Sequence, residues 1–175
     1  GMVNDSQMGD ASFAQLVQDH EIAHTYFPFY MGINETRYAF MDEGWATTLE
    51  YLIGIAEKGK KAADEFYKQF RVNSYIKDKS TEEDQPIITM SSQLSGAGYG
   101  NNSYGKASLS YLALKDMLGD DLFKKALHTY MDNWNGKHPI PWDYFNSMNT
   151  GAGQNLNWFF NNWFFSNNYL DLRIG

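Results

Sequence analysis

The spacing of two histidines, His20 and His24, constrains the fold of this chain more than any other feature of its sequence. Phe13 and Val17 continue the same spacing toward the N-terminus, and the pattern predicts an amphipathic helix over residues 11–27. Helical residues four apart lie about 40° from each other around the axis, so both imidazoles can reach one ion. A metal ion held there needs at least one further ligand from another part of the fold.

The five residues His20-Glu21-Ile22-Ala23-His24 form the pattern H-E-x-x-H, which is typical of a zinc site whose glutamate acts as a general base. Glu21 lies on the edge of the helix next to the histidines, where its carboxylate can hold a metal-bound water. A catalytic zinc ion normally takes three protein ligands and keeps its fourth position open for water. The sequence therefore predicts a Zn²⁺ cofactor, with His20 and His24 as ligands and Glu21 as catalytic base.

Glu43 is the candidate for the third ligand, because eighteen residues separate it from His24 and leave room for a turn back toward the first helix. Glu50 follows seven residues later, on nearly the same face of a second predicted helix. A carboxylate there can accept a hydrogen bond from a ligand imidazole and fix which ring nitrogen carries the proton. Asp42 and Asp19 are further candidates for this supporting role.

The composition excludes several other classes of protein. The chain has 14 basic and 21 acidic residues and a formal net charge of −7, which argues against nucleic-acid binding because that function needs basic patches. The absence of cysteine excludes disulfide scaffolds, thiolate metal sites and thiol nucleophiles. No run of about 20 apolar residues occurs, so the sequence predicts no membrane span. A length of 175 residues suits one domain.

The periodicity of apolar residues predicts a mainly α fold of about six to seven helices with little or no sheet. The predicted helices cover residues 11–27, 39–56, 60–76, 106–118, 120–134, 142–148 and 156–165. Pro28 is expected to end the first of them. A weak strand signal covers residues 86–90.

Residues 77–104 are expected to form a long connection, and its glycines suggest a mobile wall that presents Tyr104. The aromatic residues of the last predicted helix are expected to pack in the core. His128 and His138 are expected to be structural or exposed rather than ligands.

The H-E-x-x-H pattern followed after eighteen residues by glutamate is the gluzincin arrangement, and the wider sequence resembles peptidase family M1. This family comprises zinc aminopeptidases related to aminopeptidase N and leukotriene-A hydrolase. The resemblance rests on His24-Thr-Tyr-Phe27, on Asp42-Glu43-Gly44-Trp45-Ala46 with Glu50, and on the helical stretch from Leu118 to Trp163.

A further segment, Tyr104-Gly105-Lys106-Ala107, resembles the Tyr-x-Lys-Gly segment of the family, whose tyrosine hydrogen-bonds the tetrahedral oxyanion. The resemblance therefore implies a catalytic role for Tyr104. The residues alone leave Tyr99, in the same glycine-rich stretch, as an alternative.

The resemblance implies that residues 11–175 form one metallopeptidase domain, the helical half of a thermolysin-like (gluzincin) catalytic domain, within a longer protein. Residues 1–10 are expected to be disordered or a remnant of cloning. The implied function is zinc-dependent, aminopeptidase-like hydrolysis of a peptide or protein by a metal-activated water. The helical half would pack against an N-terminal sheet or a C-terminal domain of the longer chain, so exposed apolar surface is expected.

Other interpretations stay open at this point. The chain lacks the Gly-x-Met-Glu-Asn segment with which the family binds the free amino terminus of its substrate, so an endopeptidase is an alternative to an exopeptidase. A second interpretation is a fragment that holds zinc but is inactive, or a module that binds a peptide or a partner protein. A helical interaction domain with an accidental H-E-x-x-H pattern would bind no stoichiometric metal. The compartment is open, and the asparagine- and aromatic-rich composition only favours export.

Overall fold

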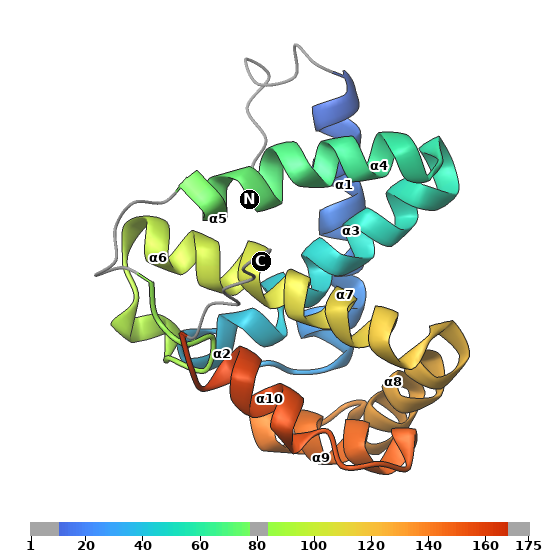
Figure 1. The fold of residues 1–175 in the computed structure, drawn as a ribbon, viewed down its shortest axis with the longest axis vertical. Coiled ribbons are helices and arrows are strands. Elements are labelled where there is room, and N and C mark those ends of the chain that lie inside the picture. Colours follow the sequence, from blue (N-terminus) through green and yellow to red (C-terminus); the bar gives the residue numbers. More distant parts are fainter. Residues whose placement is uncertain (1–10, 78–83, 168–175) are drawn as a thin grey trace, which may run out of the picture.

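The computed structural model describes residues 11–77 and 84–167, and every regular element within these two ranges is helical (Figure 1). Seven helices have eight residues or more: α1 (Ala11–Ala23), α3 (Glu43–Lys58), α4 (Lys60–Tyr67), α7 (Ala107–Leu118), α8 (Asp120–Trp134), α9 (Pro141–Ala152) and α10 (Asn157–Phe164). The predicted mainly α fold is thereby confirmed, with no strand in the described part of the chain. None of these helices is long and apolar enough to cross a membrane.

Shorter helical turns link these helices. They are α2 (Glu35–Tyr38), α5 (Asn73–Lys77), α6 (Gly96–Gly100), the 3₁₀ turns η3 (Ala39–Met41) and η5 (Ser91–Gln93), the π-helical turns η4 (Lys68–Val72) and η6 (Asn101–Lys106), and the kinked segment η2 (Thr25–Tyr30), in which Phe27 is not helical. The turn η4 joins α4 to α5, and η6 joins α6 to α7, so residues 60–77 and 96–118 are two long helical runs.

Three predicted helix boundaries are wrong by four residues, and one of them is the end of α9, which lies at Ala152 rather than Met148. The helix α1 ends at Ala23 rather than at Phe27; Phe27 itself takes an extended backbone (φ −131°, ψ 110°), as expected for the residue before Pro28, and buries its ring. The helix α3 begins at Glu43 rather than at Ala39, because a 3₁₀ turn precedes it. Glu43 is therefore the first residue of its helix, with its side chain at the end that meets α1.

The predicted connection over residues 77–104 is wrong from Gly96 onward, where the chain is helical, whereas residues 84–95 form a connection with one short 3₁₀ turn. That this segment is mobile stays a prediction. Glycine serves close packing in the helical part: a Cβ on Gly105 would lie 2.8 Å from the carbonyl oxygen of Arg71. Residues 86–90 include a turn and no strand, and Ile87 is buried in the core. The expectation of disorder for residues 1–10 lies outside the described residues.

The core surrounds Trp45, near the start of α3. Its indole ring stacks on Tyr111 of α7, with ring centroids 4.0 Å apart, and on Phe27, at 5.5 Å. Tyr144 of α9 meets the same indole edge-on at 5.9 Å. Because aromatic stacking of buried rings favours specific orientations, these contacts fix α3 relative to its neighbours. Figure 1 shows α1, α3 and α4 together at one end of the molecule and α8, α9 and α10 at the other.

Only some of the aromatic side chains in and next to α10 are buried in the core. Phe159, Phe160 and Phe164 are buried, as expected, whereas Trp158 and Phe165 are exposed. His128 and His138 are exposed, and His138 contacts the carbonyl oxygen of Gly32 through Nδ1 at 2.9 Å.

Two helical glycines are expected to respond oppositely to alanine. A Cβ on Gly54 would lie 3.7 Å from the Cβ of Ala63, an ordinary contact, so Gly54→Ala should stabilise the protein by about 0.5–1 kcal/mol through its helix propensity. A Cβ on Gly151 would lie 2.5 Å from the Cα of Ala126, so Gly151→Ala should destabilise by about 1–3 kcal/mol. Urea unfolding of both variants measures this difference, and equal stabilities would contradict the packing described.

Candidate metal centre

The end of α1 and the first residue of α3 bring three candidate metal ligands together. The ligand atoms of His20, His24 and Glu43 all lie within 4.8 Å of one another. Glu43 Oε2 is 3.0 Å from His20 Nε2 and 3.5 Å from His24 Nε2. Two ligands of a tetrahedral zinc ion lie about 3.3 Å apart when each bond is about 2.0–2.1 Å long. The donor set and its spacing therefore fit zinc.

Glu50 contacts the far nitrogen of His20. Its Oε2 lies 2.9 Å from His20 Nδ1, and the Glu50 side chain is almost fully buried. An ionised carboxylate only accepts hydrogen bonds, so Nδ1 carries the proton and donates. The lone pair of a neutral His20 is then on Nε2, which faces Glu43.

His24 is held in the same way by other partners. Its Nδ1 lies 2.8 Å from Asp42 Oδ1 and 2.8 Å from the carbonyl oxygen of Phe27. Both partners are acceptors, so this nitrogen also carries a proton and Nε2 faces the site. The extended Phe27, four residues after the end of α1, thus supplies one of these acceptors through its carbonyl oxygen. Asp19, the third supporting candidate, is buried but hydrogen-bonds neither histidine; the charged groups around it include Glu57 and Lys58.

Tyr104 and Glu21 lie at the same place. The Tyr104 ring is nearly parallel to the His20 imidazole, with centroids 5.9 Å apart, and its hydroxyl lies close enough to Glu43 to act toward lowering the pKa of that carboxylate. Tyr99 lies further out, with its ring 6.4 Å from that of Tyr104. Glu21 is exposed and borders a hollow of about 370 Å³ together with the three candidate ligands and Tyr104.

The carboxylates beside both histidines raise the histidine pKa values in the metal-free protein. Burial lowers the pKa of His20, but its hydrogen bonds to two glutamates outweigh this effect and raise it. The hydrogen bond to Asp42 raises the pKa of His24 to about 9. Burial acts to raise the pKa of Glu43, yet its hydrogen bonds, the first with His20, lower it. Burial raises the pKa of Asp42 to about 6.

Comparison with known proteins places this chain in a family. The model of the peptidase family M1 domain matches residues 2–163. The chain belongs to peptidase family M1. The M1 chain is 24% identical over 170 residues to Aminopeptidase M1 from Arabidopsis thaliana. The matched region covers 89% of this chain and 18% of the Arabidopsis protein.

Solved structures of M1 zinc metallopeptidase from Deinococcus radiodurans share the fold of this M1 chain. A mutant form matches with a TM-score of 0.67 and 20% identity, over 90% of this chain and 34% of that one. The same mutant bound to the substrate Tyr-Ser-Ala matches with a TM-score of 0.63 and 20% identity, over 85% and 32%. The M1 chain thus spans about a third of these structures and less than a fifth of the Arabidopsis protein.

Sequence reasoning missed Arg71, which contacts Glu50 beside the candidate metal ligands. Arg71 lies on η4, and its Nη2 donates to Glu50 Oε2 at 2.6 Å while Nε donates to Oε1 at 3.3 Å. No local pattern links Arg71 to Glu50, because they are 21 residues apart on different helices. The sequence offers one weak signal, namely that Arg71 lies near the end of the helix predicted over residues 60–76.

The metal-free protein is expected to lose stability at alkaline pH. Because the pKa of His24 is raised from 6.5 to about 9, its protonated form stabilises the fold below about pH 6.5. This stabilisation is lost as the pH rises through about 9. Urea unfolding with a chelator present, repeated across this range, measures the loss.

The matched variant for this pH experiment is His24→Asn, which keeps an N–H donor near Asp42 but does not titrate. Its free energy of unfolding should change less over the same range. An equal fall in the variant and the wild type would show that His24 is not the titrating group.

Proposed function

We propose that this M1 chain hydrolyses peptide bonds with a zinc ion held by His20, His24 and Glu43. The observation that carries the proposal is the convergence of the three ligand atoms within 4.8 Å, with each Nδ1 bound to an acceptor and each Nε2 facing the site. Zinc is also the metal of the structurally similar metallopeptidases. Residues 11–175 would form one domain around this centre.

The side chains around the proposed zinc would share the proton and charge transfers of hydrolysis. Zinc, when bound, polarises a scissile carbonyl and lowers the pKa of a water. Glu21, next to His20 in the chain and on the same hollow, would take the proton of that water and pass it to the leaving amine. The Tyr104 hydroxyl, which lies near Glu43, would donate to the oxyanion that develops on the carbonyl.

The proposed substrate is a peptide or protein, cleaved from its amino terminus. Two similar proteins support this class: one is named Aminopeptidase M1, and the structure of the other is bound to the substrate Tyr-Ser-Ala. The longer protein would cover part of the surface beside the site. Four exposed apolar side chains there support such packing: Ile22, Tyr26, Phe29 and Tyr30.

Zinc content and hydrolysis test the proposal together. The wild-type protein should hold one zinc per chain, and His20→Ala, His24→Ala and Glu43→Ala should each lose it. Glu21→Gln should keep zinc but cleave aminoacyl substrates about 100- to 10,000-fold more slowly. Absence of zinc from the folded wild type would refute the metal site, and near-wild-type hydrolysis by Glu21→Gln would refute the base.

Internally quenched peptides, assayed beside the aminoacyl substrates, separate the related alternatives. Cleavage of only the quenched peptides would favour an endopeptidase. Stoichiometric zinc with no turnover of either substrate would favour the zinc-holding, peptide-binding module.

Removal of the Tyr104 hydroxyl tests the oxyanion role separately. Tyr104→Phe should keep zinc and the ring contact with His20 but reduce kcat by about 100- to 1,000-fold, because one oxyanion donor is lost. Tyr99→Phe is the matched control, since Tyr99 belongs to the same helical region but does not contact His20. Steady-state kinetics of both variants provide the comparison, and a larger loss from Tyr99→Phe would move the role to that residue.

A further inference from the structure

Arg71 is in contact with two different supports of the proposed metal centre. Its guanidinium binds both oxygens of Glu50, at 2.6 and 3.3 Å, and Glu50 in turn accepts the Nδ1 hydrogen bond of His20. The Arg71 Cζ also lies 5.7 Å from the ring centroid of Tyr104. We propose that Arg71 is a positioning residue, which orients Glu50 behind His20 and holds the ring of Tyr104 beside it. This inference rests on the proposed function.

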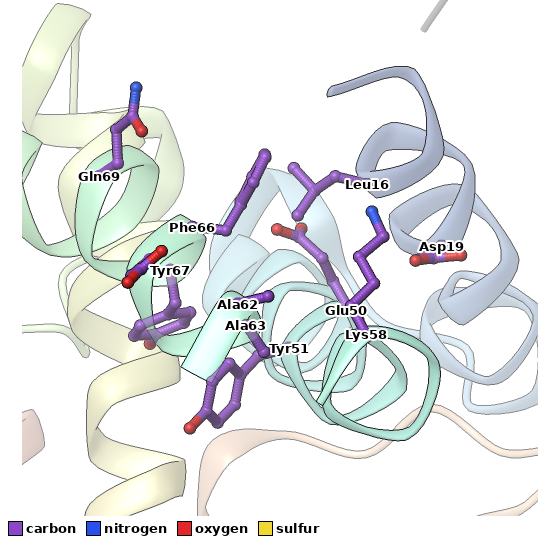
Figure 2. A pocket seen from close by; sticks show the side chains of 12 residues that line it. Leu16, Asp19, Glu50, Tyr51, Lys58, Ala62, Ala63, Phe66, Tyr67 and Gln69 are labelled. Carbon is purple, nitrogen blue, oxygen red and sulfur yellow. The ribbon is translucent and has the colours of Figure 1, made fainter. Parts of the chain in front are cut away.

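The two-point contact to Glu50 matters because this carboxylate has room to turn away. A pocket of about 240 Å³ lies between α1, α3 and α4, and Glu50 forms part of its wall (Figure 2). Figure 2 shows Leu16 and Phe66 beside the Glu50 carboxylate. A planar guanidinium bound to both oxygens fixes the plane of a carboxylate as a single contact does not. Without Arg71, Glu50 can rotate toward this pocket and weaken its contact with His20.

A close approach of two backbone segments, η4 and η6, brings Arg71 next to Tyr104. Gly105 lets η6 approach η4 so closely that a Cβ there would meet the Arg71 carbonyl oxygen at 2.8 Å. Tyr104, the residue before Gly105, consequently lies against both the Arg71 guanidinium and the His20 imidazole. Both Arg71 and Tyr104 belong to π-helical turns, which occur often at functional sites.

Zinc affinity of the folded protein tests the proposal, because a merely structural arginine would change stability and leave this affinity unchanged. Arg71→Met should weaken zinc binding by about 10- to 100-fold, as loss of an outer partner of a ligand histidine typically does. Arg71→Lys keeps the charge without the planar fork and should recover only part of the affinity. Competition with a chromogenic chelator measures each value. Arg37→Met is the matched control, since Arg37 is exposed and lies on α2.

A double-mutant cycle identifies the route of the effect. If Arg71 acts through Glu50, Arg71→Met should cost little further zinc affinity in a Glu50→Gln background. In the zinc-loaded wild type, long-range ¹H–¹⁵N spectra should show the His20 proton on Nδ1. In Arg71→Met, the exchange of this proton with water should be faster.

The outcomes separate this inference from the function on which it rests. A wild-type protein without zinc refutes the proposed function and the inference with it. A wild type that binds zinc through His20, together with a folded Arg71→Met of unchanged zinc affinity, overturns the inference alone. If Arg71→Met does not fold, Arg71→Gln replaces it under the same criterion, because glutamine fills similar space without the charged fork.

Discussion

The packing of α3 against α1 is the contact on which the candidate site depends. The two helices lie together at one end of the molecule, and the aromatic stack around Trp45 fixes the start of α3. Because Glu43 is the first residue of α3, this packing sets its distance from the two histidines. A displacement of α3 by one helical residue, about 1.5 Å, would remove the convergence of the three ligand atoms.

The same contact buries charge, and the site is arranged to compensate for it. Asp42 and Glu50 are almost fully buried, which is costly for a carboxylate without partners. Asp42 contacts His24, and Glu50 contacts both His20 and Arg71. Removal of one partner from a buried pair typically costs about 3–5 kcal/mol. The groups that would tune the metal ligands therefore also hold α1 and α3 together.

The fold class could be predicted because apolar periodicity marks long amphipathic helices, and α7 and α8 lie where that pattern put them. The H-E-x-x-H pattern and Glu43 could be singled out because their spacing is local to two adjacent helices. The extended backbone of Phe27 could be predicted from Pro28, which disfavours helical geometry at the residue before it, whereas no local signal marks the end of α1 at Ala23. Arg71 was missed because its partner is chosen by tertiary packing, and no spacing along the chain encodes it.

The π-helical turns have a consequence for how this chain relates to others of its family. A π-helical turn is equivalent to one residue inserted into an α-helix, and one residue corresponds to a rotation of about 100° about the axis. Side chains before η6 therefore lie on a different face of the continuous helix from the one that the spacing of residues after η6 would predict. A relative without this inserted residue would align well along α7 and still direct a different position toward His20. Correspondence of side chains around this centre therefore has to be judged by position in space rather than by count along the chain.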